Sequence, residues 1–241
     1  MSYTLEFLTN NPEQISDLSE VYGASYIKLS ERYKGKREMA LYTPEYFKGR
    51  LEKFAEDSDS MTFVVSDEEK AVGFARFSPV PTTYKSLPKG LSVHLEKGEM
   101  DGFEYQWLRE VRMRSSPKYN DRTVMLNQMY LAPDVQHKGL GTQIFASVMP
   151  TLEEKYDNVV VEFNLKNAKG IRFYKSMGFE VRGITQDLDH ILPTKNEWGR
   201  RMCVSNVGIA DAPIQTVREN AVRKLAQHNL PLLRFGRQNE R

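Results

Sequence analysis

The chain has 241 residues, of which 40% are hydrophobic and 27% charged, so it is long and apolar enough to bury the core of one large domain. Lysine and arginine total 34 and aspartate and glutamate total 32, and the formal net charge of +2 lacks the broad positive field of a dedicated nucleic-acid binder. The single cysteine, Cys203, excludes an internal disulfide framework, and the four scattered histidines show no HExxH spacing. We therefore expect no metal site and no nucleic-acid partner.

The sequence also carries no targeting or membrane signal. The N-terminus lacks the basic-then-apolar pattern of a signal peptide, and no apolar run approaches the length that spans a bilayer. We therefore expect a cytoplasmic protein without a membrane partner.

The first part of the chain predicts a strand, two helices and a hairpin. Residues 3–8 alternate like a strand, and apolar residues recur at helical spacing over 12–29 and again over about 44–54. Two strand-like runs, at 61–66 and 71–77, flank a polar turn and predict an antiparallel hairpin.

Residues 78–122 break this regularity. Several prolines and glycines interrupt the segment, and it is long for a loop in a compact domain. Long loops of this kind often act as lids or binding walls, so we treat the segment as an insertion.

From residue 123 onward, strands and helices alternate. The expected elements are a strand at 123–131, a helix at 139–155, a strand at 159–164, a helix at 168–177, strands at 179–184 and 201–207, and a helix at 212–228. Pro150 should kink the first of these helices or end it near Met149. This order predicts an α/β sheet with at least one parallel strand pair. We expect one domain over 1–207 with an insertion at about 78–122, followed by a C-terminal helical extension over 208–241.

The segment from Asn127 to Thr142 carries the clearest chemical signal. A strand stops near Pro133, and Gly139 and Gly141 open a helix, where bare backbone N–H groups and the helix dipole form an anion site suited to a diphosphate. A dinucleotide fingerprint would need a small residue at Ile144, and the Gly-Lys-Ser/Thr of a P-loop does not occur. The segment therefore fits neither of those nucleotide sites.

The run Gln136-His137-Lys138-Gly139-Leu140-Gly141 resembles the Gln/Arg-x-x-Gly-x-Gly/Ala signature of the GNAT superfamily of N-acetyltransferases. Downstream, Asn167-Ala168 and the run from Phe173 to Phe179 resemble the second element of that family, in the expected order and spacing. The resemblance covers about 123–183, and it implies a mixed, mostly antiparallel sheet with a parallel, splayed strand pair, flanked by helices. It also implies acetyl-coenzyme A (acyl-CoA) as cofactor and an amine as acceptor.

The resemblance assigns contacts to that cofactor. The main chain of Met129, Tyr130 and Leu131 would pair with the pantetheine arm along a parted strand edge, and Asn167 would bond the same arm. The diphosphate would be held by the turn and the start of the helix, namely Gln136, His137, Lys138, Gly139, Leu140, Gly141 and Thr142. Tyr174 would face the sulfur and protonate the leaving thiolate, since a phenol is neutral at physiological pH.

The proton acceptor is less clear, because a free alkylamine must lose a proton before it attacks. Many relatives carry a glutamate two positions before Asn127, whereas this chain has Met125. Glu162, Glu110 and a water chain are the candidates. Glu162 shares a strand face with Val160 and Asn164, so it either faces the cleft as the base or has a structural pairing role.

The acceptor itself stays open. The acidic segment 185–198 would suit a cationic amine beside the thioester, but it also reads as an ordinary acidic loop. A small amine, a protein or peptide amine, and a non-catalytic acyl-CoA binding role are the three functions compatible with the sequence. The helix at 212–228 packs on its own sheet or on a second subunit, and the resemblance favours a homodimer.

Overall fold

The computed structural model describes residues 2–30, 42–80, 119–164, 167–187 and 205–236. The elements follow in the order β1 (Thr4–Phe7), α1 (Pro12–Ser30), α3 (Pro44–Glu56), β2 (Met61–Ser66), β3 (Ala71–Pro79), β4 (Thr123–Leu131), α5 (Leu140–Glu153), β5 (Asn158–Asn164), α6 (Ala168–Ser176), β6 (Glu180–Asp187), β7 (Ser205–Pro213), α7 (Ile214–His228) and β8 (Arg234–Phe235). Within these ranges, no helix is both long and apolar enough to cross a bilayer.

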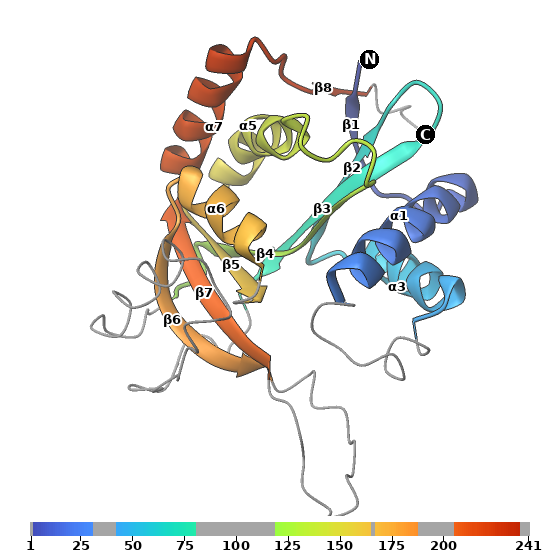
Figure 1. Ribbon diagram of the computed structural model, residues 1–241, viewed down its shortest axis with the longest axis horizontal. Coiled ribbons are helices and arrows are strands. Elements are labelled where there is room, and N and C mark those ends of the chain that lie inside the picture. Colours follow the sequence, from blue (N-terminus) through green and yellow to red (C-terminus); the bar gives the residue numbers. More distant parts are fainter. Residues whose placement is uncertain (1, 31–41, 81–118, 165–166, 188–204, 237–241) are drawn as a thin grey trace, which may run out of the picture.

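The described strands form one sheet in the order β6-β7-β5-β4-β3-β2-β1-β8. Two neighbouring pairs, β4–β5 and β1–β8, are parallel, and the others are antiparallel. Helices α5, α6 and α7 lie on one side of the sheet and α1 and α3 on the other (Figure 1). The predicted fold class, a mixed and mostly antiparallel sheet with a parallel pair and flanking helices, is confirmed.

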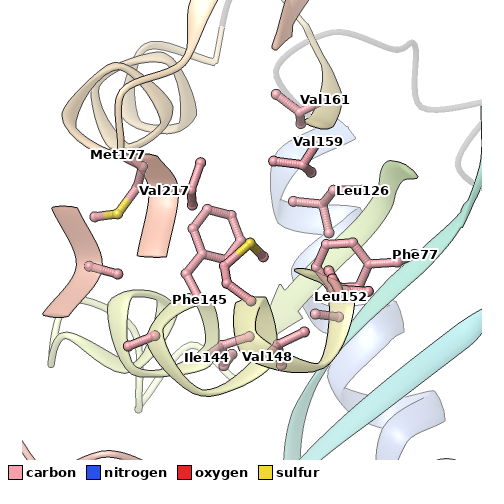
Figure 2. Close-up of a cluster of buried hydrophobic side chains, with 14 of the residues drawn as sticks. Phe77, Leu126, Ile144, Phe145, Val148, Leu152, Val159, Val161, Met177 and Val217 are labelled. Carbon is pink, nitrogen blue, oxygen red and sulfur yellow. The ribbon is translucent and has the colours of Figure 1, made fainter. Parts of the chain in front are cut away.

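The larger core lies between the sheet and helices α5 and α7. Alternate residues of the central strands point to this side, and Figure 2 shows Leu126, Val159 and Val161 facing Phe145 and Val148 of α5. All five side chains are at most 2% exposed. This packing fixes α5 on β4 and β5, and therefore fixes the position of the turn that precedes α5.

The second core holds α1 and α3 against the opposite face. Helix α3 begins at Pro44, and its N-cap Thr43 accepts a hydrogen bond from the Tyr46 amide at 3.3 Å. Its buried residues Phe47 and Leu51 pack with Phe74 of β3. The two N-terminal helices are thereby held beside β3 and β4.

Strands β4 and β5 pair over only part of their lengths. Thr123 to Leu126 pair with Asn158 to Val161, and beyond Leu126 strand β4 pairs with β3 alone, while Glu162 to Asn164 of β5 pair with β7 alone. The register between β3 and β4 also shifts, because Gln128 faces Arg76 and Leu126 faces Phe77. Asn127 is therefore the extra residue of a β-bulge at the point where β4 and β5 separate.

Two predicted bounds need correction. Helix α5 runs through Pro150 to Glu153, so the expected end near Met149 is wrong, whereas the alternative, a kink at Pro150, stays a prediction. Met149 and Leu152 are fully buried on either side of the exposed proline, and their packing offsets a helix-breaking cost of about 3 kcal/mol.

The strand predicted at 201–207 is β7, which runs from Ser205 to Pro213. Residue 208, where we placed the start of a C-terminal extension, lies inside this strand. Small residues such as Ala210 and Ala212 give only a weak strand signal in the sequence. Strand β7 lies between β5 and β6, and these neighbours provide its burial.

The ends of the insertion pack against the sheet. Val80 and Tyr119 form a small buried cluster with Met125, Val160 and Ile209. The rest of the insertion, with Glu110, lies outside the described residues, as do Cys203 and most of the acidic segment 185–198.

Candidate active site

The turn between β4 and α5 has two residues in the left-handed region. His137 has φ 65° and Gly139, the N-cap of α5, has φ 80°. Gly139 provides no side-chain cap, and its carbonyl accepts the amides of Thr142 and Gln143 at 2.9 and 3.1 Å. The amides of residues 139–141 have no backbone acceptor among the described residues, so they are free to donate to a ligand, and the expected anion site at this turn stays a prediction.

The start of α5 lies close to β4 and α6. A Cβ atom added to Gly141 would lie 3.3 Å from Cζ of Phe173 and 3.8 Å from Cε of Met129. One added to Gly139 would lie 2.3 Å from Cδ1 of Leu230, in the segment after α7. The predicted turn, the exposed stretch of β4 and the helix that carries Tyr174 therefore meet at one place.

The open edge of β4 presents main-chain groups. In a strand, successive residues direct N–H and C=O alternately to the two sides, and the Ala132 amide donates to the Val72 carbonyl at 2.8 Å. This alternation directs the main chain of Met129 and the amide of Leu131 to the side from which β5 has separated. The main chain of Tyr130 points toward β3 instead.

The Leu131 carbonyl is already in use. It accepts Oγ of Ser25 at 2.7 Å and Nε2 of Gln136 at 2.8 Å, so both of its lone pairs are occupied. Gln136 therefore ties the turn to the end of β4, which is a different contact from the predicted one with a diphosphate.

Basic side chains surround the turn. Lys138 is exposed, and Nζ of Lys169, in the first turn of α6, lies 3.4 Å from Nε2 of His137. Nearby positive charge favours an anion at this place. Sequence reasoning missed Lys169, and only its position beside His137 in the fold identifies it.

Asn167 caps helix α6. Its side-chain oxygen accepts a hydrogen bond from the Gly170 backbone amide at 3.1 Å, and the backbone amide of Asn167 donates to the Asn164 carbonyl at 2.8 Å. Its side-chain oxygen is therefore engaged in the cap, which leaves the Nδ2 group as the donor toward a ligand.

Tyr174 lies in an aromatic environment. Its ring centroid is 6.3 Å from that of Phe163 and 5.5 Å from those of Phe173 and Phe179. Burial raises the pKa of Tyr174 to about 12. Its hydroxyl has no hydrogen-bond partner among the described residues, so it is a neutral donor available to a ligand.

Polar groups also lie on β4 and β5 where these two strands separate. The side-chain oxygens of Asn127 and Gln128 are buried and unpartnered in the described part of the chain. Glu162 is half-buried on β5, between the buried Val161 and Phe163. Met125 is 5% exposed and packs on Val160, so this position is part of the core. Asn127 and Gln128 were missed, since the family resemblance implied a bulge in the parted strand and nothing in the sequence shows which side chains it would leave buried and unpartnered.

Known proteins share the fold described above. A model of the Acetyltransferase (GNAT) family matches residues 26–179. Among solved structures, the PaiA N-acetyltransferase of Thermoplasma acidophilum in complex with coenzyme A has a TM-score of 0.52 and 12% identity, covering 88% of this chain and 99% of that chain.

Two further structures show the same fold. An acetyltransferase from Thermus thermophilus has a TM-score of 0.53 and 15% identity, covering 87% of this chain and 97% of that chain. The yncA protein of Salmonella typhimurium, solved with its cofactor acetyl-CoA, has a TM-score of 0.51 and 15% identity, covering 89% of this chain and 95% of that chain. Since the family match spans well over half of the sequence, the chain belongs to the acetyltransferase (GNAT) family, whose cofactor is acetyl-CoA.

Proposed function

We propose that this protein transfers an acetyl group from acetyl-CoA to the primary amine of a small molecule, by direct attack while both substrates are bound. The observation that carries the proposal is the parting of β4 from β5 beside the uncapped start of α5. Acetyl-CoA, when bound, supplies the acetyl thioester, and all other roles fall to side chains and amides of this chain.

The cofactor contacts follow from the groups left free in the fold. The amides of residues 139–141, with Lys138 and Lys169 nearby, would bind the diphosphate. The outward main-chain groups of Met129 and the amide of Leu131 would bond the pantetheine arm, as a neighbouring strand would. These contacts would direct the sulfur toward the separation of β4 and β5.

Two side chains would move the protons of the reaction. The amine nitrogen forms a bond to the acetyl carbon, the carbon–sulfur bond breaks, and the thiolate takes the proton of Tyr174. The proton lost by the amine would pass to Glu162 or to water, since Met125 cannot accept it. The unpartnered oxygens of Asn127 and Gln128 would accept N–H groups of the amine and so orient it.

A small acceptor is favoured by the packing of α1 and α3. Tyr22 and Phe47 pack against each other with ring centroids 4.7 Å apart, and Tyr22 lies at the same distance from Tyr130 of β4. These rings cover the face of β4 on the side of α1 and α3, which supports a small acceptor over a peptide.

Steady-state turnover of acetyl-CoA with a panel of amines tests the reaction. Tyr174→Phe should lower kcat by about 10²- to 10⁴-fold, the usual contribution of a general acid, and should leave the Kd for coenzyme A unchanged. Tyr156→Phe is the matched control, since Tyr156 belongs to the same core cluster and lies just after the far end of α5.

Unchanged kcat in Tyr174→Phe would remove this residue from the mechanism. Glu162→Gln should abolish the acidic limb of the kcat/KM profile if Glu162 is the base. Absence of transfer to any amine, with coenzyme A bound normally, would leave only acyl-CoA binding.

A further inference from the structure

Arg50 of α3 has an unusual environment for a half-buried charge. Its Nη1 group donates to the Tyr46 hydroxyl at 3.0 Å, and its guanidinium lies 5.5 Å from the Phe54 ring centroid and 5.8 Å from that of Tyr46. Its Nε atom is buried and has no hydrogen-bond partner in the described structure, which is also true of Nε of Arg76.

Other partly buried arginines of the described chain have a carboxylate partner. Arg76 contacts Asp57 at 2.5 Å, Arg182 contacts Asp211 at 2.8 Å, and Arg218 contacts Glu153 at 2.5 Å. Arg50 has none among the described residues, and its neighbours are tyrosine hydroxyls. Buried charges are normally paired, because desolvation without a counter-charge is costly.

Arg50 also lies near β4, since Arg76 stacks on the same Phe54 ring and pairs in register with Gln128. The ring centroid of Tyr130, on the exposed stretch of β4, lies 4.7 Å from that of Tyr22 and 5.7 Å from that of Phe74. Burial raises the pKa of Tyr130, as do Tyr22 and Tyr174, while the charge of Arg50 acts in the opposite direction. Tyr130 is thus within electrostatic reach of both Arg50 and Tyr174.

We propose that Arg50 binds an anionic group, a carboxylate or a phosphate, on the amine that this enzyme acetylates. The Nη2 group makes no hydrogen bond among the described residues and would be the first donor to the anion. A small shift of the surrounding rings would add the buried Nε, and the resulting two-donor edge matches the oxygens of either anion. The Tyr46 ring lies beside the guanidinium, and Tyr22 and Tyr130 are within its electrostatic reach. The inference rests on the proposed transfer to an amine, and it specifies the chemical class of the acceptor.

The alternative role for Arg50 is structural, since its guanidinium also stacks on aromatic rings. A structural role would affect all acceptors alike. Recognition of an anion would affect only acceptors that carry one, and it would act mainly on KM.

Matched acceptor pairs separate these roles. We would measure kcat and KM for tyrosine against tyramine, histidine against histamine, and phosphoethanolamine against ethanolamine, with 1,4-diaminobutane as a purely cationic amine. The wild type should prefer the anionic member of at least one pair, and the pair shows whether the anion is a carboxylate or a phosphate. Arg50→Met should lower kcat/KM for that member about 10- to 100-fold, the usual effect of losing a hydrogen bond to a charged group.

The member of the pair that lacks the anionic group should change less than about threefold. Arg50→Lys should retain part of the preference, because it keeps the charge but loses the two-donor edge. Arg76→Met is the control, since Arg76 lies over Phe54 at 4.4 Å and is paired with Asp57. It should shift both members of a pair equally.

Equal losses for both members in Arg50→Met would overturn the proposal, as would a preference of the wild type for 1,4-diaminobutane. If Arg50→Met does not fold, we would compare how strongly 3-(4-hydroxyphenyl)propanoate and its neutral amide inhibit the wild type. The carboxylate should inhibit more strongly, and equal inhibition by the two compounds would contradict anion recognition. Transfer to no amine at all would refute the proposed function itself.

Discussion

Replacement of Gly139 by alanine tests the turn that precedes α5. At φ 80°, an L-residue costs about 1–2 kcal/mol relative to glycine. The new Cβ would also lie 2.3 Å from Cδ1 of Leu230, far inside the usual carbon–carbon separation of about 3.5–4.0 Å. Rotation of Leu230 and repacking add about 1–3 kcal/mol, so Gly139→Ala should lower the free energy of unfolding by about 2–5 kcal/mol.

A double-mutant cycle with Leu230→Ala divides this loss into its two causes. Leu230→Ala removes the atom that collides, so the two substitutions should show a favourable coupling of about 1–3 kcal/mol in urea unfolding. The remaining loss reports the backbone conformation alone. Gly49→Ala is the matched control, because nothing lies within 4 Å of its added Cβ, and this helical site should gain about 0.5–1 kcal/mol.

The same variant should weaken binding of coenzyme A, measured by calorimetry on the folded protein. If the backbone leaves the left-handed region, the amides of residues 139–141 turn away, and each lost hydrogen bond to a phosphate costs about 10- to 100-fold in Kd. A Gly139→Ala protein as stable as Gly49→Ala and with unchanged Kd would refute this reasoning.

Two further predictions concern stability. Burial raises the pKa of Tyr22 to about 12, so the neutral phenol is favoured in the folded state. Between pH 10 and pH 12 the free energy of unfolding of the wild type should therefore fall by up to about 2.7 kcal/mol more than that of Tyr22→Phe. An equal change in the free energy of unfolding of the two proteins between pH 9 and pH 11 would contradict this. Burial also raises the pKa of Asp211 above its usual value, although Arg182 is its ion-pair partner. Arg182→Met should therefore destabilise the protein by about 1–3 kcal/mol at pH 7 and by less near pH 4, where Asp211 takes up a proton. Urea unfolding at the two pH values measures this, and an equal loss of stability at both would show that an uncompensated Asp211 charge is not the cause.

Local features were predictable from sequence because their causes are local. Pro44 following Thr43 starts α3, and Gly178, with φ 95°, follows the end of α6. The turn at residues 136–141 is specified by its own glycines in the same way. The separation of β4 from β5 was expected only from the family resemblance, since no nearby residue requires it.

Features built from distant segments could not be predicted. Tyr22, Arg50 and Tyr130 come from three separate elements, and their proximity depends on how α1 and α3 pack beside β4. The bulge at Asn127 likewise depends on the register of β3, and periodicity within β4 does not show it. Sequence reasoning therefore located the glycine-containing turn before α5 and missed Arg50, Asn127 and Gln128.

The order of the strands has a consequence for biosynthesis. Among the described strands, β6 is attached to the sheet only through β7, and β1 pairs on its outer side with β8, where the Gly236 amide donates to the Leu5 carbonyl at 2.8 Å. Both margins of the sheet are therefore completed by residues after 204. While the ribosome still covers that stretch, β6 has no partner and β1 keeps a bare outer edge, so we expect the nascent chain to need protection from aggregation until its last strands emerge.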